Sequence, residues 1–176
     1  MYFWTKNCSF RAVKNEHLFL PHYFDHMNLS FTCKHFDHLS LKELYDSMVL
    51  RQEIFVVEQN CAFLDADGKD QIAYHCFGYD TDEQLHAYTR LLDKGIAYPE
   101  YASIGRVLTS GASRGGGWGR KLMEYSIAQL YATFGQQAIK IGAQAYLEKF
   151  YGSLGFVQCG EGYLEDGIPH IPMLRD

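Results

Sequence analysis

Four glycines at positions 115, 116, 117 and 119 stand where a predicted strand passes into a predicted helix. Glycine has no side chain, so the backbone N–H groups of such a turn can converge on one anion, beside the positive end of the helix dipole. Arg114, Arg120 and Lys121 add positive charge nearby. A pyrophosphate is therefore the natural occupant, although a tight turn with only a structural role has the same composition.

The spacing of these glycines distinguishes between classes of phosphate-binding loop. A Walker-type loop continues from its last glycine into Lys and then Ser or Thr, whereas Gly119 is followed by Arg120 and Lys121. The dinucleotide pattern fails because its last glycine would follow Gly117 by three positions rather than two. Arg114-x-x-Gly117-x-Gly119 instead resembles the R-x-x-G-x-G motif of GCN5-related N-acetyltransferases (GNAT), whose loop holds the pyrophosphate of coenzyme A.

Longer stretches of residues 29–176 resemble the ElaA-like subgroup of this family. They are Leu50-Arg51-x-Glu53-Ile54-Phe55-Val56-Val57-Glu58-Gln59, Ile104-Gly105-Arg106-Val107, Gly142-Ala143-Gln144-Ala145, Phe150-Tyr151-x-x-x-Gly155-Phe156 and Glu165-Asp166-Gly167-Ile168-Pro169-His170. The resemblance implies the GNAT acyl-CoA N-acyltransferase fold, an α/β (α+β layered) domain whose mixed central sheet is flanked by helices. It names no acceptor.

For the donor, the resemblance implies acetyl-coenzyme A (acetyl-CoA), attacked directly by an amine in a ternary complex. The strand before the glycine loop would pair with the pantetheine arm, and a backbone N–H near Val107 or Leu108 would polarise the thioester carbonyl. One such donor contributes about 3 kcal/mol in other enzymes. The predicted coenzyme-binding residues are Val107, Leu108, Thr109, Arg114, Gly115, Gly116, Gly117, Trp118, Gly119, Arg120, Lys121 and Gln144.

Tyr151 lies where the family motif has a tyrosine that protonates the departing thiolate. The alternative is an ordinary half-buried aromatic residue on a helix, because Phe150 and Phe156 beside it are typical core residues.

A base must also deprotonate the acceptor ammonium, directly or through water, because only the free lone pair attacks. The candidates are Glu53, Glu58, His75, Glu165, Asp166 and His170. We assign catalytic roles to Glu165 and His170, together with Tyr151, and substrate binding to Arg51, Glu53, Glu58, His75 and Asp166. Two alternatives remain open: Arg51 in a structural ion pair with Glu53 and Glu58, and residues 165–170 as a solvated turn.

Composition excludes several other classes of function. A formal net charge of -5 without a basic block argues against nucleic acid, and the sequence has no apolar run of the roughly 20 residues that span a bilayer. Five cysteines without a C-x-x-C pair favour free thiols in the cytoplasm. We expect no metal, since His22 and His26 lack accompanying ligands, and a calcium loop at Asp65-x-Asp67 lacks its glycine and its final glutamate.

The elements that position these residues follow from local patterns. Ser40 and Glu43 form a capping box, which predicts a helix over residues 40–52. Strands are predicted over residues 72–79 and 84–92 as a hairpin, and then over 102–109, 138–143 and 156–163. A helix is predicted after the glycine loop, because apolar residues there recur on one helical face: Met123, Ile127, Leu130, Tyr131 and Phe134. A second helix is predicted over residues 146–154. Pro169 and Pro172 limit the C-terminus to an edge strand at most.

We therefore expect one GNAT domain over residues 29–176, preceded by a 28-residue extension without clear periodicity. Met27 is our hypothesis for the functional start of the chain. The leading function is an N-acetyltransferase acting on a small molecule or on a peptide or protein amine, of unknown oligomeric state. The alternatives are a non-catalytic acetyl-CoA sensor of the same fold and a nucleotide-phosphate-binding protein.

Overall fold

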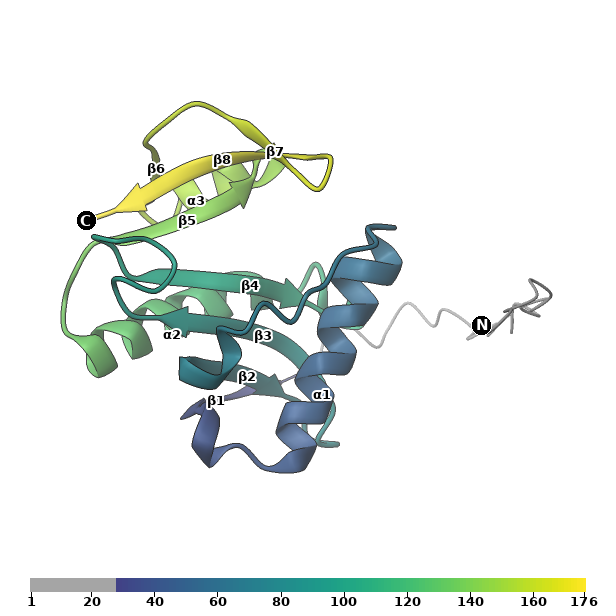
Figure 1. Cartoon of the computed structure of the whole chain (residues 1–176). Coiled ribbons are helices and arrows are strands. Elements are labelled where there is room, and N and C mark those ends of the chain that lie inside the picture. The colour runs from purple at the N-terminus through teal and green to yellow at the C-terminus, as the bar shows by residue number, and fades with distance from the viewer. Residues whose placement is uncertain (1–27) are drawn as a thin grey trace, which may run out of the picture.

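The computed structural model describes residues 28–176, which form two antiparallel sheets with helices packed on them (Figure 1). The first sheet has the strand order β1-β2-β3-β4, and the second has the order β5-β8-β6, with β7 also paired to β8. The strands are β1 (Ser30–His35), β2 (Tyr74–Tyr79), β3 (Leu85–Leu92), β4 (Ser103–Thr109), β5 (Ile139–Gln144), β6 (Val157–Gln158), β7 (Tyr163–Glu165) and β8 (Ile168–Arg175). The helices are α1 (Leu41–Arg51), the π-helical η3 (Gln52–Glu58), α2 (Trp118–Phe134) and α3 (Glu148–Gly152), with short 3-10 turns at η2 (Phe36–His38), η4 (Asp70–Ile72), η5 (Gly111–Ser113) and η6 (Ala145–Leu147).

Local signals fix the first half of the domain as predicted. The capping box is present, since Ser40 Oγ accepts from the Glu43 N–H at 3.1 Å and the Glu43 carboxylate accepts from the Ser40 N–H at 2.8 Å. The predicted hairpin is β2 and β3, and Asp80 Oδ1 accepts from two backbone N–H groups in its turn. Helix α1 does not stop at the predicted boundary but continues into η3.

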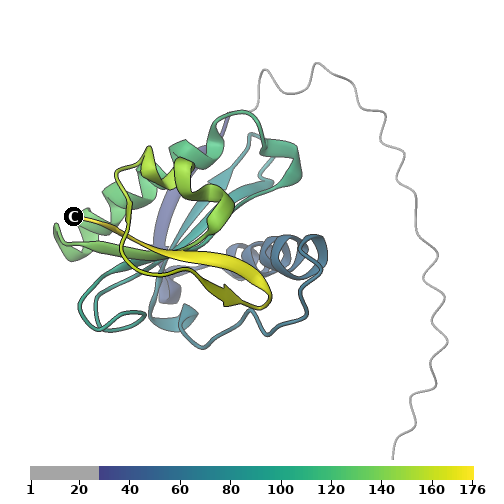
Figure 2. The ribbon, with the colours of Figure 1, turned by 90° about the horizontal axis from the view of Figure 1, so that it is seen from above.

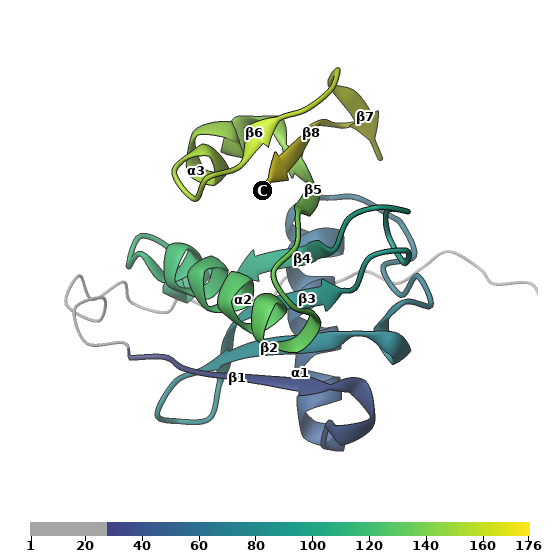
Figure 3. The ribbon, with the colours of Figure 1, turned by 90° about the vertical axis from the view of Figure 1, so that its left-hand side faces the viewer.

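The two sheets meet at a single point and then separate. The Ala102 N–H donates to the Ala138 carbonyl at 3.2 Å, and the Lys140 N–H donates to the Ala102 carbonyl at 2.9 Å, which makes a parallel bridge between Ala102 and Ile139. The combined sheet is therefore mixed, and the unit β4, α2, β5 is a parallel crossover. The predicted α/β GNAT fold with its mixed central sheet is confirmed. Beyond the bridge β4 and β5 diverge (Figure 3).

Helices cover both faces of the first sheet (Figure 2). On one face Leu50 and Ile54, from α1 and η3, pack with Phe77, Tyr88 and Leu108. On the other face the predicted stripe of α2 is buried against the strands, with Met123, Ile127 and Leu130 in the largest core cluster. Because the sheet is held between two apolar layers, β4 is a rigid platform for the residues that follow it.

The predicted strand over residues 156–163 is interrupted. Only Val157 and Gln158 pair with β8 as β6, and pairing resumes at Tyr163 in β7. The segment between them contains Gly160 and Gly162, and glycine weakens strands because it has no side chain to pack.

The prediction of an edge position for the C-terminal strand is wrong, because β8 lies between β5 on one side and β6 and β7 on the other. Both prolines fall where no ladder bond is lost. The carbonyl of Pro172 accepts from the Cys159 N–H at 2.9 Å, so the ring nitrogen faces the interruption between β6 and β7. The β5 ladder ends with the pair Gln144 and His170, so Pro169 lies beyond it.

Candidate active site

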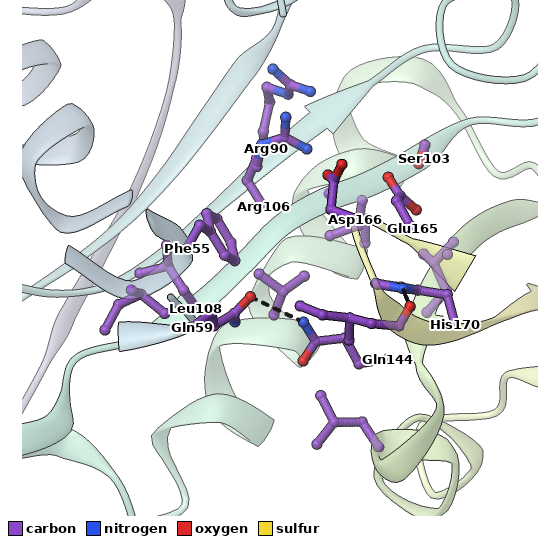
Figure 4. Close-up of a pocket in the computed structure, with 18 of the residues that line it drawn as sticks. Phe55, Gln59, Arg90, Ser103, Arg106, Leu108, Gln144, Glu165, Asp166 and His170 are labelled. Atoms are coloured by element: carbon purple, nitrogen blue, oxygen red, sulfur yellow. Dashed lines mark hydrogen bonds between the residues drawn. The ribbon is translucent and has the colours of Figure 1, made fainter. Parts of the chain in front are cut away.

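A cavity of about 800 Å³ lies between the diverging strands β4 and β5. A second hollow of about 370 Å³ lies at the glycine loop and shares Thr109, Arg114 and Gly119 with the first. Together they form one path that begins at the start of α2, follows β4 and ends at the turn between β7 and β8. The cavity is drawn in Figure 4 with its side chains.

The glycine loop has a backbone conformation in which residues with a side chain would be strained. Gly115 has φ +84 and Gly117, the N-cap of α2, has φ +76, both in the left-handed region. A Cβ on Gly116 would lie 2.9 Å from the Trp118 indole, whereas a Cβ on Gly119, which lines both hollows, would have ordinary room within the protein. Backbone groups at the positive end of a 17-residue helix are thus open to a ligand.

The three cations of the loop point in different directions. Arg114 lines both hollows and forms a bidentate ion pair with Glu58, with N···O distances of 2.7 and 2.9 Å. Arg120 lines the loop hollow and contacts Glu124 and Ser153. The Lys121 ammonium lies 4.1 Å from the centroid of the Trp118 ring. Arg114, paired with Glu58, and Arg120 therefore line the hollow at the glycine loop, while Lys121 packs on the indole.

A β-bulge interrupts β4 in the middle of the cavity wall. Tyr88 pairs with Leu108 and Arg90 pairs with Gly105, so Thr89 alone lies opposite Arg106 and Val107. Arg106 has φ +52, a strained value for a residue with a side chain. A bulge leaves backbone groups out of the ladder and re-aims side chains. Val107, Leu108 and Thr109, predicted to hold the coenzyme, all line the cavity.

Tyr151 is buried on α3 and lines the same cavity. Its ring packs edge-on against Phe150 and Phe156, at centroid distances of 5.0 and 6.0 Å. Burial raises the pKa of the phenol well above its usual range, so the hydroxyl is protonated. No group within residues 28–176 forms a hydrogen bond with that hydroxyl, which leaves it available to a ligand.

Glu165 at the end of β7, Asp166 in the turn and His170 on β8 line the cavity from this hairpin (Figure 4). Asp166 and Gly167 both have positive φ, and the flanking pair Glu165 and Ile168 closes a two-residue hairpin. His170 Nδ1 lies 2.8 Å from the Ile168 carbonyl. Because a carbonyl only accepts, Nδ1 carries the proton, and in the neutral ring Nε2 has the free lone pair.

Three of the residues assigned to substrate binding lie outside the cavity. Arg51 is 1% exposed and its guanidinium contacts Asp65 at 2.6 Å and Asp70 at 2.9 Å, rather than Glu53 and Glu58. Glu53 is exposed on η3.

The third is His75. Its Nδ1 lies 2.6 Å from the Tyr88 hydroxyl and its Nε2 lies 2.9 Å from the Asp70 carbonyl. Burial lowers the pKa of His75, so the ring is neutral and held between two partners. Glu58 and Asp166, from the same set of predictions, do line the cavity.

The polar residues at the far end of the cavity had no site role among the residues predicted from the sequence. These residues are Gln59, Asp67, Lys69, Arg90, Ser103, Arg106 and Tyr163. Gln59 accepts a hydrogen bond at 3.3 Å from Gln144, a predicted coenzyme residue, across the two walls. A signal was present for Arg106, which follows Gly105 inside the Ile104-Gly105-Arg106-Val107 motif, but the local pattern does not show where its side chain points.

Comparison with known families decides the identity of this arrangement. The family described as "Acetyltransferase (GNAT) domain" matches residues 51–176, which include the glycine loop, the bulged strand and the turn at the far wall. The chain belongs to the GNAT acetyltransferase family. Its members transfer acyl groups from acyl-CoA donors, so this GNAT chain is an acyltransferase.

The relatives of this GNAT chain confirm the predicted ElaA-like subgroup. Protein ElaA of Escherichia coli is 42% identical over 144 residues, covering 81% of this chain and 93% of ElaA. The crystal structure of an acyl-CoA N-acyltransferase from Pseudomonas aeruginosa superimposes with a TM-score of 0.79 at 43% identity, covering 85% of this chain and all of the other. The crystal structure of E. coli ElaA gives the same TM-score of 0.79.

The extension predicted over residues 1–28, including His22 and His26, lies outside the described residues except for Asn28. Within the described part of the chain, no helix has the length and apolarity needed to cross a bilayer.

Proposed function

We propose that this protein transfers the acetyl group of acetyl-CoA to an amine, on a small molecule or a peptide, by direct attack in a ternary complex in the cytoplasm. The observation that carries the proposal is the single path from the glycine loop, along bulged β4 and past Tyr151, to the polar turn at Glu165 and His170. An anion site at one end and acid–base groups at the other fit a phosphorylated donor and an amine acceptor.

The donor end of the path suits coenzyme A. The pyrophosphate would lie against the backbone of residues 115–119 with Arg114 and Arg120 beside it, because these groups converge at the start of α2. The pantetheine arm would extend along Thr109 and Leu108, which line the cavity between the diverging strands. At the bulge a backbone N–H near Val107 would donate to the thioester oxygen, where charge develops.

The chemistry then needs three proton transfers: one from the acceptor ammonium, one from the nitrogen as it becomes the amide, and one to the departing sulfur. His170 Nε2 takes a proton from the acceptor ammonium, directly or through water, and Glu165 on the same turn attracts that cation. The free amine lone pair forms a C–N bond to the thioester carbonyl carbon, and the tetrahedral intermediate collapses with cleavage of the C–S bond. The sulfur leaves with the bonding electrons and receives a proton from the Tyr151 hydroxyl. The nitrogen loses its second proton as the amide forms, and that proton returns through water to the Tyr151 oxygen.

Release of free thiol from acetyl-CoA, measured with pooled primary amines, tests this function. We expect thiol release that depends on an amine and falls strongly in Tyr151→Phe, with Lys34→Gln on the distant strand β1 as the matched control. Coenzyme A that binds without any release would favour the sensor of the same fold. Stabilisation by ATP or NAD in place of coenzyme A would favour a nucleotide-binding protein.

A further inference from the structure

We infer that the acceptor is a small amine that also carries a carboxylate, and that Arg106 and Lys69 bind this carboxylate. The inference rests on the proposed function and specifies its acceptor. Once the coenzyme is assigned to the loop and to Val107, Leu108 and Thr109, the remaining part of the cavity is strongly polar. Its lining includes Lys69, Arg90 and Arg106 as well as Glu165, Asp166 and His170.

Arg106 presents an unused edge of its guanidinium group. Its Nε donates to Asp65 Oδ1 at 2.6 Å, and its Nη2 donates to the Asp65 carbonyl at 3.0 Å and lies 3.6 Å from Asp67 Oδ2. Within residues 28–176 no acceptor is bonded to its Nη1, and its side chain is 23% exposed at the cavity wall. Asp65, itself buried, thus fixes the plane of the guanidinium and leaves N–H groups for a ligand oxygen.

Arg90 adds a second unsatisfied donor. Two N–H groups of its guanidinium are held by Asp67 at 2.7 Å, but its Nε is buried and has no hydrogen-bond partner. The Arg90 side chain is 4% exposed and lines the cavity. A buried donor without a partner costs free energy, so the hydrogen bonding of the Arg90 guanidinium beside the cavity is incomplete.

The charges of this cluster do not cancel. Its cations are Arg51, Lys69, Arg90 and Arg106, and its anions are Asp65, Asp67 and Asp70. Lys69 lines the cavity and forms no ion pair with any described residue. Lys69 is thus a cation at the cavity without an acidic partner in the cluster, and an anion that enters the cavity would be attracted to it.

The opposite wall has the reverse charge. Glu165 and Asp166 extend into the cavity across from Arg90 and Arg106 (Figure 4), and the Asp166 carbonyl accepts from the Cys61 thiol at 3.8 Å. A ligand with one cationic and one anionic group satisfies both walls. A plain amine leaves Lys69 and the free Nη1 of Arg106 without an anionic partner, and a dianion meets the acidic wall.

The spacing restricts the ligand further. Arg106 directly precedes Val107, whose backbone is assigned to the thioester, so the carboxylate site lies within one side chain's reach of the reacting carbon. The amine and the carboxylate of the acceptor must therefore be separated by only a few bonds. This is the chemistry of an amino acid.

Matched acceptor pairs that differ only in the carboxylate test the inference. The pairs are L-phenylalanine with phenethylamine, L-lysine with cadaverine and L-alanine with ethylamine. We measure kcat/KM by thiol release from acetyl-CoA, and binding of each compound by calorimetry in the presence of coenzyme A. In at least one pair, the kcat/KM of the compound with the carboxylate should exceed that of its partner by about 10- to 100-fold, the range of one charge-assisted hydrogen bond.

Arg106→Gln should remove this difference, because it keeps a donor for Asp65 and loses the charge. Arg106→Lys should keep part of it. Lys34→Gln should retain all of it, since Lys34 lies on β1 and pairs with Glu43 of α1, away from the cavity. Stabilisation of each variant by coenzyme A alone reports that the fold is intact.

The outcomes separate the two proposals. Thiol release with no preference for the carboxylate, or a preference that survives in Arg106→Gln, overturns the inference and leaves the proposed function standing. Carboxylate-dependent binding without thiol release overturns the proposed function and keeps the binding site. If the protein shows no binding preference for the carboxylate and no thiol release, both proposals are overturned.

Discussion

At the scale of single residues, the account depends on hydroxyl, imidazole and guanidinium groups that share one cavity. Tyr151 is packed by aromatic neighbours on two sides and its hydroxyl is free for the ligand. A raised pKa keeps the phenol protonated through the neutral range, so the group is ready to donate to a departing thiolate and cannot act as a base there.

Tyr151→Phe keeps this packing and removes only the hydroxyl. We expect kcat to fall by about 10²- to 10⁴-fold, the range of a positioned proton donor, while KM for acetyl-CoA changes little. Steady-state kinetics with varied acetyl-CoA measures both constants. Unchanged kcat would show that water, and not Tyr151, protonates the sulfur.

His170→Ala tests the base by a different signature. The variant should lose activity near neutral pH, where an amine acceptor is protonated, and recover as the pH approaches the acceptor's own pKa, which is about 10 for an alkylamine. The recovery distinguishes a lost base from a disturbed fold. A loss of activity of equal size at every pH would assign the role to another group, with Glu165→Gln as the next variant to measure.

At the scale of elements, the glycine loop and the bulged strand β4 both place strained backbone beside the cavity. Gly115 and Gly117 accept positive φ without a penalty, whereas Arg106 adopts it despite its side chain. The Arg106 conformation is held in place by the buried carboxylate of Asp65.

Gly117→Ala introduces a Cβ at φ +76, where the left-handed conformation costs an ordinary residue about 1–2 kcal/mol. We expect a lower free energy of unfolding by that amount and weaker binding of coenzyme A. Denaturant melts and calorimetry measure the two effects. Gly111→Ala is the matched control in the same loop, because its φ is not positive and a Cβ there meets open space.

The elements that sequence analysis predicted correctly are those encoded by neighbouring residues. The capping box of Ser40, the turn at Asp80 and the glycine pattern at Gly117 each depend on contacts within a few positions. The interior position of β8 does not, because its neighbours β5 and β6 are separated from it along the chain. Pro172 is tolerated only because an interruption happens to face it, which no local pattern reveals.

The same limit applies to the candidate site. The glycine loop was assigned from spacing, but the polar acceptor end is backed by an Arg–Asp network from four separate segments, around Arg51, Asp65, Arg90 and Arg106. Sequence proximity suggested Glu53 and Glu58 as partners of Arg51, whereas the fold brings Asp65 and Asp70 to it. Partner choice in such a network is set by tertiary contacts.

At the scale of the whole molecule, the Arg–Asp network joins α1, β3 and β4 with the loop before β2. Burial alone would raise the pKa of Asp67 and of Asp70, but hydrogen bonds from Arg90 and Arg51 outweigh it and lower both. Burial also lowers the pKa of His75 within the same region. For all three groups the folded state binds protons less readily than the unfolded state.

This linkage predicts stability that falls with decreasing pH. Because their folded pKa values are lowered, Asp67 and Asp70 contribute to the free energy of unfolding in full above their ordinary pKa of 3.8, and this contribution is lost as the pH falls below it. His75 adds a loss of stability at higher pH, since in the unfolded chain it begins to bind a proton near pH 6.5. Urea melts between pH 7 and pH 3 measure the trend. Asp67→Asn should be less stable at pH 7 and should lose less stability on acidification than the wild type.

Equal acid sensitivity of the Asp67→Asn variant and the wild type would contradict this account of the network. Lys42→Gln serves as the control, since its exposed pair with Asp46 lies on α1 away from the cavity and should leave the acid dependence nearly unchanged.

The most direct test of the central claim follows an isotopically labelled acetyl group from acetyl-CoA to its acceptor by mass spectrometry. The account predicts that labelled N-acetyl amine and free coenzyme A form in equal amounts, that unmodified enzyme remains throughout, and that product formation nearly stops in Tyr151→Phe. Bound acetyl-CoA that yields no labelled amine with any acceptor would contradict it, as would a labelled acetyl group attached to the enzyme on the path to product.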